Sequence, residues 1–273
     1  MTSETPPSDA ANEIPSFSLD LFSLAGRVAV VTGGSDGIGR MIAHGFVDAG
    51  ASVVIAARRQ SKIDSVVAEI EAKGGNVLGV STDVTDIASV QHMRDAALER
   101  FGQIDILMNV VGGSQGPTFS RGRLLDLDKA DFMEAFNINV GSVFVCCHEI
   151  VPHMLEREMG VVINMSSIGA RDYRMPEPVM SVYNMTKAAV MHLTRNMAKE
   201  WEPNVRVNCI NAGHFLTPRR VRTETPERRA KSLAEIQIGR FGTPADIAAA
   251  AVFIASDAGA FFNASYLDLN GGV

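Results

Sequence analysis

Residues 28–59 change their hydrophobic period twice, which predicts a strand, a helix and a second strand. Val28–Val31 is a short run of Val and Ala, typical of a central parallel strand that is covered on both faces. After a glycine-rich turn, apolar residues recur every three or four positions, as on one helix face: Ile38, Met41, Ile42 and Phe46. Gly50 is suited to end that helix, and Ser52–Ala57 resumes the strand pattern. Because parallel strands need such a crossover helix, the unit predicts an α/β fold.

The same alternation continues to the C-terminus. Further strands are expected at residues 77–80, 104–109, 160–165, 205–210 and 266–269. Helices are expected at residues 61–73, 86–100, 128–158 and 183–201, and a last one begins at Thr243-Pro244 by its cap and its first-turn Pro. This order predicts a doubly wound parallel sheet of about seven strands, with helices on both faces. One domain is expected over residues 19–273, after a polar, Pro-rich flexible tail at residues 1–18.

The long helical stretch at residues 128–158 carries an aromatic pattern of its own. Four apolar residues follow one another at four-residue steps: Phe132, Phe136, Val140 and Phe144. Residues at this spacing share one face of a regular helix. We therefore expect the stripe to pack into the core rather than to contact a cofactor.

Composition narrows the classes of function. At 273 residues, with 46% hydrophobic and 21% charged residues, the chain can bury a sizeable core in one domain. A formal net charge of −6 disfavours nucleic acid as a partner. No uninterrupted apolar run approaches the ~18 residues of a membrane helix, and the N-terminus lacks the basic start and apolar stretch of a secretory signal. We expect a cytoplasmic protein that is not bound to a membrane.

Cysteine and histidine usage indicates neither disulfides nor a metal. Cys146, Cys147 and Cys209 form no CxxC pair and no even set, so we expect them to be buried apolar residues. The six histidines include no HExxH motif, and the five-residue spacing of His148 and His153 does not place both on one helix face.

The turn between the first strand and the first helix reads TGGSDGIG over residues 32–39. Its glycines allow positive φ and leave no Cβ to hold a ligand away from the backbone. The first helical turn offers unpaired N–H groups and the positive end of the helix dipole. Within a complete strand-turn-helix-strand unit this pattern predicts a pyrophosphate site, with a merely tight turn as the alternative.

Two spacings point to one family. The turn has the form TGxxxGxG, and Tyr183 precedes Lys187 by four residues, after the Ser166-Ser167 pair that follows the fifth strand. With these motifs, residues 24–273 resemble the short-chain dehydrogenase/reductase family. The resemblance implies a Rossmann-like fold, an NAD(P)-dependent alcohol dehydrogenase or ketone reductase, and a homo-oligomer, either a tetramer or a dimer.

The resemblance also implies a set of cofactor-binding positions. They are Gly33, Ser35, Asp36, Gly37, Ile38 and Gly39 in the turn, Arg58 and Arg59 after the second strand, Asp83 and Val84 after the third, Asn109 and Gly112 after the fourth, Tyr183 and Lys187, and Gly213, Phe215 and Thr217 after the sixth. Two departures stand out, because the family's NNAG is Asn-Val-Val-Gly at residues 109–112 and its Pro-Gly is Ala-Gly at residues 212–213. Asp83 has a second interpretation as a helix cap.

The choice between the two dinucleotides depends on charge. The family usually places an acidic residue at the end of the second strand to hold the ribose of NAD, and this chain has Ala57 there, followed by Arg58 and Arg59. A 2′-phosphate repels a carboxylate and attracts a guanidinium, which favours NADP over the alternative, NAD. Asp36 argues against NADP, since NADP-preferring relatives often carry a base there.

Catalytic roles follow from the same resemblance. Tyr183 is the expected proton donor, and the nearby Lys187 ammonium favours its phenolate form. Ser167 is expected to stabilise the carbonyl oxygen, with Ser166 as the fallback because the loop at residues 170–180 looks extended. Asn139 is the expected member of a water-linked proton path. Asn137 competes for that position, and a purely structural Asn139 is a further alternative.

The sequence narrows the expected substrate to two classes of ketone. The opening resembles 3-oxoacyl reductases, and other segments are more similar to hydroxysteroid dehydrogenases, so a 3-oxoacyl or an alicyclic, steroid-like ketone is expected. Met175, Met180 and Phe215 are expected to line an apolar pocket. A nucleotide-sensing module without turnover, and a lyase or epimerase on the same fold, remain as alternatives.

A basic segment follows the sixth strand, in the expected lid at about residues 214–238. Its cationic residues are Arg219, Arg220, Arg222, Arg228, Arg229 and Lys231, interspersed with Glu224, Glu227 and Glu235. Such a run is either a solvated helix face or an electropositive lid that suits an anionic substrate or carrier.

Overall fold

The computed structural model describes residues 16–116, 118–171 and 179–273, in which seven parallel strands form one sheet in the order β3-β2-β1-β4-β5-β6-β7. The strands are β1 (Val28–Thr32), β2 (Ser52–Ala57), β3 (Val77–Ser81), β4 (Ile106–Asn109), β5 (Gly160–Ser167), β6 (Val205–Ala212) and β7 (Tyr266–Leu269). From β1 the chain builds outward to β3 and then returns to build the other half from β4. This arrangement confirms the doubly wound, Rossmann-like fold.

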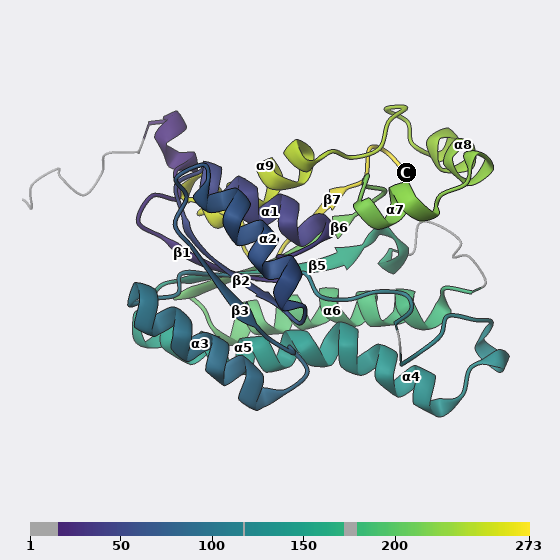
Figure 1. Ribbon diagram of the computed structural model, residues 1–273, viewed down its shortest axis with the longest axis horizontal. Coiled ribbons are helices and arrows are strands. Elements are labelled where there is room, and N and C mark those ends of the chain that lie inside the picture. Colours follow the sequence, from purple (N-terminus) through teal and green to yellow (C-terminus); the bar gives the residue numbers. More distant parts are fainter. Residues whose placement is uncertain (1–15, 117, 172–178) are drawn as a thin grey trace, which may run out of the picture.

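Helices cover both faces of the sheet (Figure 1). One face carries α1 (Gly37–Asp48), α2 (Gln60–Glu71) and α9 (Pro244–Ala255), and the other carries α3 (Ile87–Phe101), α5 (Ser142–Glu156) and α6 (Ser181–Glu200). Each face has its own apolar core, since alternate strand residues point to opposite sides. This is why β1 reads as an unbroken apolar run, for all five of its residues are buried.

The expected helix at residues 128–158 is three segments. They are α4 (Lys129–Phe136), a π-helical turn (Asn137–Gly141) and α5. The predicted core stripe is wrong for Phe144, which is 55% exposed, whereas Phe132 and Val140 are partly buried against apolar clusters. Helix α5 instead buries Val143, Cys146, Cys147 and Ile150. The π turn inserts extra residues into the spiral, so positions at four-residue steps across it no longer share a face.

By length and mean hydropathy, the combined stretch Lys129–Glu156 could cross a bilayer, and half of its apolar window is buried inside the protein. Core helices pass the same test, so this is weak evidence for a membrane span. The three cysteines are buried and free, as predicted.

The segment at residues 214–238 holds two short helices, α7 (Pro218–Thr223) and α8 (Pro226–Glu235). They lie beyond the carboxyl ends of the central strands (Figure 1). The last helix begins as predicted, since Thr243 caps it in a capping box with Asp246. Of the predicted tail, residues 1–15 are outside the described residues; Leu19–Phe22 forms a 3₁₀ turn. Other 3₁₀ turns are Leu124–Asp126, Ile168–Ala170 and Asp257–Gly259.

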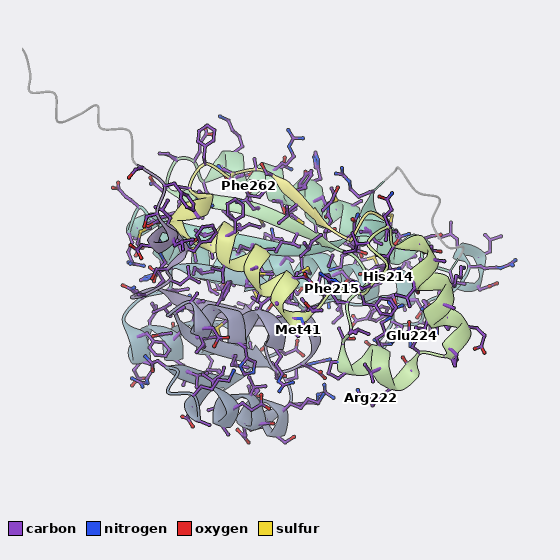
Figure 2. The ribbon with its side chains drawn as sticks, turned by 90° about the horizontal axis from the view of Figure 1, so that it is seen from above. Met41, His214, Phe215, Arg222, Glu224 and Phe262 are labelled. Atoms are coloured by element: carbon purple, nitrogen blue, oxygen red, sulfur yellow. The ribbon has the colours of Figure 1, made fainter. Side chains whose placement is uncertain are left out.

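Helix α1, which follows the glycine turn, packs closely against α9, and the two are seen side by side from above (Figure 2). The approach depends on Gly45, because a Cβ at this position would overlap the Ala248 side chain. A glycine inside a helix is unfavourable by itself. The contact therefore sets how closely α1 packs against α9.

We predict that Gly45→Ala lowers the free energy of unfolding by about 1–3 kcal/mol, because the added methyl overpacks the α1–α9 contact. Urea unfolding measures the change. The double variant Gly45→Ala/Ala248→Gly should be more stable than the two single effects predict, since it removes the overlap. A Gly45→Ala protein as stable as the wild type would contradict this account of the contact.

Candidate active site

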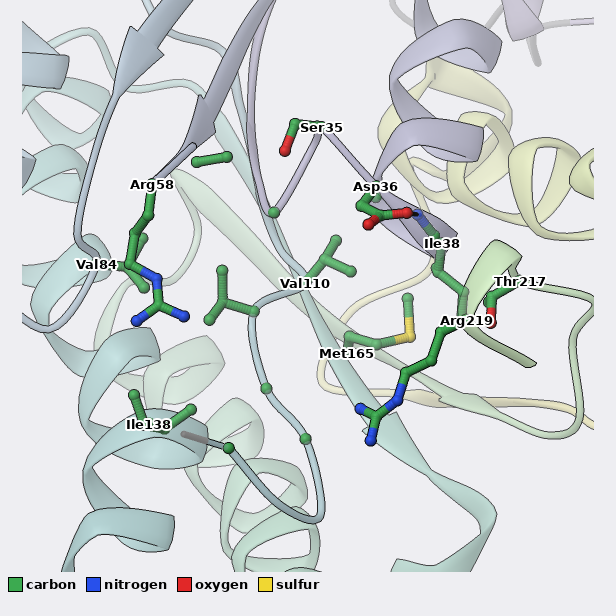
Figure 3. Close-up of a pocket in the computed structure, with 18 of the residues that line it drawn as sticks. Ser35, Asp36, Ile38, Arg58, Val84, Val110, Ile138, Met165, Thr217 and Arg219 are labelled. Atoms are coloured by element: carbon green, nitrogen blue, oxygen red, sulfur yellow. Dashed lines mark hydrogen bonds between the residues drawn. The ribbon is translucent and has the colours of Figure 1, made fainter. Parts of the chain in front are cut away.

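A cavity of about 930 Å³ lies at the carboxyl ends of the central strands, where β1 and β4 diverge to opposite halves of the sheet. It is lined by most of the predicted site residues: Gly33, Ser35, Asp36, Gly37, Ile38, Gly39, Arg58, Arg59, Asp83, Val84, Gly112, Ser167, Tyr183, Lys187, Gly213 and Thr217. Figure 3 shows Arg58 and Arg219 on opposite sides of this cavity. Among the described residues, no three His, Cys, Asp or Glu side chains are grouped to hold a metal ion.

The glycine turn has the geometry that a dinucleotide pyrophosphate requires. Gly33 and Gly37 adopt positive φ, at 68° and 52°. A Cβ on Gly39 would overlap the Gly33 carbonyl, so only glycine lets the turn close onto the helix. The Thr32 hydroxyl accepts the Val110 N–H at 3.0 Å and ties the turn to the loop after β4. The cradle that the missing side chains leave at the start of α1 fits the phosphates of a dinucleotide.

Asp36 is occupied by contacts within the protein. Its carboxylate caps α1 by accepting the Gly37 N–H at 2.8 Å, and it forms ion pairs with Lys62 and with Arg59, the latter at 3.4 Å. Burial would raise the pKa of this carboxyl, but the hydrogen bonds from Lys62 and Gly37 outweigh burial and leave the pKa below its ordinary value. The negative charge that argued against a 2′-phosphate is thus compensated by two cations.

Asp83 lies at the end of the cavity that Arg58 enters. The helix-cap interpretation fails, because Asp86 caps α3 through the Ser89 N–H, at 2.9 Å. Asp83 instead accepts the N–H and the hydroxyl of Thr85, at 3.0 and 2.7 Å. Burial would raise the pKa of Asp83, but these hydrogen bonds and the Arg58 charge hold it below its usual value. A carboxylate oriented in this way is available to accept from a ligand amine.

Strand β5 and helix α6 bring the catalytic candidates together. The Ser167 hydroxyl lies close enough to the Tyr183 phenol to act on its pKa, which it lowers against the effect of burial. The Ser166 hydroxyl donates 2.8 Å to the Lys187 backbone carbonyl and is buried. Strand alternation sends consecutive serines to opposite sides. Ser167 is thus the serine that meets Tyr183, and Ser166 joins the strand to the helix.

Lys187 is a buried cation, 3% exposed, whose ammonium donates 2.9 Å to the Met165 carbonyl. Burial lowers its pKa to about 8, so the ammonium form prevails near neutrality. The Lys187 nitrogen lies 5.9 Å from the centroid of the Tyr183 ring. Burial raises the pKa of the Tyr183 phenol, and the Ser167 hydrogen bond acts in the opposite direction.

Asn139 lies in the π turn, is fully buried and does not line the cavity. Its side chain accepts the Gly113 N–H at 2.9 Å and donates to the carbonyls of Gly113 and Ala135, at 3.0 and 2.9 Å. Asn137, the competing candidate, is exposed and donates to Glu134. A Cβ on Gly112 would lie 2.6 Å from the Asn139 oxygen and 2.8 Å from the Lys187 nitrogen, so glycine permits this junction.

Thr217 joins the glycine turn to the lid. Its hydroxyl accepts the Arg220 N–H at 3.2 Å and so caps α7. Its methyl carbon lies 3.8 Å from the place that a Cβ on Gly37 would take. Any ligand on the turn would therefore also meet the start of α7.

Several predicted positions are not brought to the cavity. Asn109 is buried beneath it and donates 3.0 Å to the Asn164 side chain. Phe215 is buried in the core beside Gly242, and its carbonyl accepts the Thr217 N–H at 3.0 Å. Met180 does not line the cavity either, and Met175 is outside the described residues. The expected apolar lining by these three residues is therefore wrong for Met180 and Phe215.

Other residues form that lining. Apolar side chains come from Val110, Val111, Phe119, Ile138 and Met165, and polar ones from Gln115, Thr118 and Arg219. Met165 could have been predicted from the sequence, because it lies two residues before Ser167 in the same strand and therefore points to the same side of the sheet. The loop at residues 112–123 has no periodic pattern, so nothing in the sequence singles out Phe119.

Comparison with known proteins is consistent with this geometry. A family model described as enoyl-(acyl carrier protein) reductase matches residues 33–273. The chain belongs to the short-chain dehydrogenase/reductase family. Enzymes of this family use NAD(H) or NADP(H) to oxidise or reduce their substrates.

Curated relatives of this short-chain dehydrogenase/reductase match over almost their whole length. An uncharacterized oxidoreductase of Mycobacterium tuberculosis is 38% identical over 93% of this chain and 95% of the relative. The 7α-hydroxysteroid dehydrogenase of Escherichia coli is 36% identical, over 94% and 97%. A solved structure of a 7α-hydroxysteroid dehydrogenase with NADH and 7-oxo glycochenodeoxycholic acid superposes with a TM-score of 0.87 at 35% identity, over 94% of this chain and 98% of that one.

The depressed pKa of Lys187 predicts a pH signature in stability. Below pH 8 both folded and unfolded states hold the proton; between pH 8 and 10.5 the unfolded lysine still binds it and the folded one does not. Stability from this group therefore rises with pH in that window. Relative to Lys187→Met, the wild type should gain about 2 kcal/mol between pH 7.5 and 9.5 in urea unfolding.

The difference between the two proteins isolates Lys187 from the other groups that titrate in this range. A difference that stays constant from pH 7.5 to 9.5 would show that the Lys187 pKa is not depressed in the fold.

Proposed function

We propose that this enzyme interconverts a ketone and a secondary alcohol by hydride transfer, with Tyr183 as the general acid and base. The observation that carries the proposal is the Ser167–Tyr183–Lys187 cluster, which lines the same cavity as the glycine turn. One cavity thus contains both the proposed dinucleotide site and the residues proposed to transfer the proton. Among the described residues, no group of His, Cys, Asp or Glu side chains that could hold a metal ion accompanies this cluster.

When bound, the nicotinamide supplies the hydride that the carbonyl carbon gains. The carbonyl π electrons then move to the oxygen, and Tyr183 gives that oxygen its proton. Ser167, which lines the cavity beside the phenol, donates to the same oxygen and stabilises the developing charge. Lys187 stabilises the phenolate left behind, as its ammonium form prevails below pH 8. In the oxidative direction the phenolate accepts the alcohol proton.

Asn139 has a proposed place in returning the proton to solvent. Its side chain is fully engaged with Gly113 and Ala135, which supports a positioning role for the loop after β4. The π turn around it supports a relay as well, because such turns disturb the regular backbone bonding of a helix and can free a carbonyl for water. We propose that Asn139 acts mainly by holding Gly112 and Gly113 against Lys187.

For the cofactor we propose NADP. Arg58 and Arg59 line the cavity, and Lys62 pairs with Asp36 beside it, so a 2′-phosphate would meet two arginines with a lysine nearby. Lys62 would then trade part of its pairing with Asp36 for pairing with the phosphate. The related 7α-hydroxysteroid dehydrogenase was solved with NADH, so NAD remains the alternative.

For the substrate we propose an alicyclic, steroid-like ketone or a 3-oxoacyl thioester. The 7-oxo bile acid in the related structure supports the first class, and the acyl-carrier description of the family model supports the second. Phe119, Val111 and Met165 offer either class an apolar wall. We further propose a cytoplasmic homo-oligomer, a tetramer or a dimer, with residues 214–238 as a lid over a single domain at residues 19–273.

We predict that Tyr183→Phe lowers kcat/KM by about 10²–10⁴-fold, because the general acid is lost. Ser167→Ala should lower it by about 10²–10³-fold. The matched control is Ser166→Ala. Ser166 also lines the cavity, but its hydroxyl donates to the Lys187 backbone carbonyl, so this variant should retain activity within about threefold. A panel of ketones assayed by nicotinamide absorbance measures this. Cofactor affinity should stay within about threefold in all three. Turnover retained by Tyr183→Phe would remove Tyr183 from its role.

We predict that Arg58→Asp lowers kcat/KM for NADPH at least about tenfold relative to NADH, since a carboxylate repels the 2′-phosphate. Lys73→Asp makes the same charge change at an exposed position outside the cavity and should leave the ratio unchanged. An unaltered preference in Arg58→Asp would contradict the cofactor assignment.

A further inference from the structure

The structure separates the basic residues of the lid into two groups. Glu224, 7% exposed, binds Arg220 at 2.7 Å and pairs with Arg229 at 3.6 Å. Both guanidinium groups also lie over the Phe241 ring, at 4.2 and 5.1 Å from its centroid. Glu224 compensates one of these two positive charges, and its contacts with both arginines link α7 to α8. Neither a uniformly solvated face nor a uniformly positive lid describes the segment.

Arg219 and Arg222 leave α7 toward different spaces. Arg222 lines a separate groove between α1, α2 and the lid, together with Met41 and His44. Arg219 lines the active-site cavity. Figure 3 shows its side chain extending past Met165, with the guanidinium turned away from Ser35 and Asp36 of the glycine turn. Among the described residues no carboxylate pairs with it.

Among the described residues, no acid of the cavity compensates the charge of that guanidinium. The described carboxylates in the lining are Asp36 and Asp83, and both are already engaged, with Lys62 and Arg59 and with Thr85. Lys187 is buried against the Met165 carbonyl. In a chain of net charge −6, an unpaired cation inside a concave site is a local attractor for anions.

We propose that Arg219 binds a carboxylate on the substrate, so that the preferred substrates are anionic ketones and alcohols. The proposal rests on the reductase function given above and narrows its substrate class. A guanidinium matches a carboxylate through two parallel N–H···O bonds, which fixes the substrate's orientation as well as its charge. The competing anion is the cofactor pyrophosphate, but its cradle lies at the glycine turn, from which the guanidinium points away.

The binding test uses cyclohexanecarboxylate and its neutral analogue cyclohexanecarboxamide, titrated calorimetrically into the NADP⁺-loaded enzyme. The wild type should bind the carboxylate at least about tenfold more tightly than the amide. Arg219→Gln should abolish that preference, and Arg219→Lys should keep part of it. The matched control is Arg222→Gln, which removes the same charge from the same helix and should stay within about twofold of the wild type.

The kinetic test uses 4-oxocyclohexanecarboxylate and its methyl ester. Arg219→Gln should raise KM for the acid at least about tenfold and leave that for the ester within about twofold. Three outcomes would overturn the proposal: a wild type that binds acid and amide equally, an Arg219→Gln variant with unchanged selectivity, or weaker NADP⁺ binding in Arg219→Gln, which would assign Arg219 to the pyrophosphate. If the wild type reduces neither ketone, the reductase function is in question, and the binding titration still decides the role of Arg219.

Discussion

The site depends on one close approach, that of the Gly112 backbone to Asn139 and Lys187. No side chain fits between them, since a Cβ would lie within 3 Å of both polar atoms. The Asn139 side-chain oxygen accepts the Gly113 N–H, and its side-chain nitrogen donates to the Gly113 carbonyl. The Met165 carbonyl accepts a hydrogen bond from the Lys187 ammonium. The loop after β4, the π turn and the catalytic helix are therefore positioned by the same few contacts. Burial of the ammonium at this point is also what depresses its pKa.

The two ends of the cavity differ in their balance of acidic and basic side chains. At the nucleotide end, acids and bases occur together, and Asp36 both caps α1 and orders Lys62 and Arg59 around it. At the catalytic end, the acids are absent from the described lining and cations predominate. In the segment at residues 218–235, Glu224 engages Arg220 and Arg229, whereas Arg219 lines the cavity.

Much of this could be predicted because local signals and fold agree. The strand at Ser52–Ala57, the glycine turn and the Tyr183–Lys187 spacing each carry a periodic or motif signal that needs no distant partner. The failures arise where a distant or irregular feature decides. The π turn changes which face of α5 is buried and leaves Phe144 exposed, and no pattern in the sequence predicts such a turn. Asn109 turned toward Asn164 on the next strand, and the pairing of Asp36 with Lys62 depends on how α2 packs beside α1.

Thr217 links the glycine turn to helix α7. The same threonine caps the first turn of α7, and its methyl carbon lies 3.8 Å from the place that a Cβ on Gly37 would take. If a dinucleotide binds at this turn, as we propose, it lies next to the residue at which the Arg219 helix begins. The cofactor site and the placement of Arg219 would then depend on one shared residue.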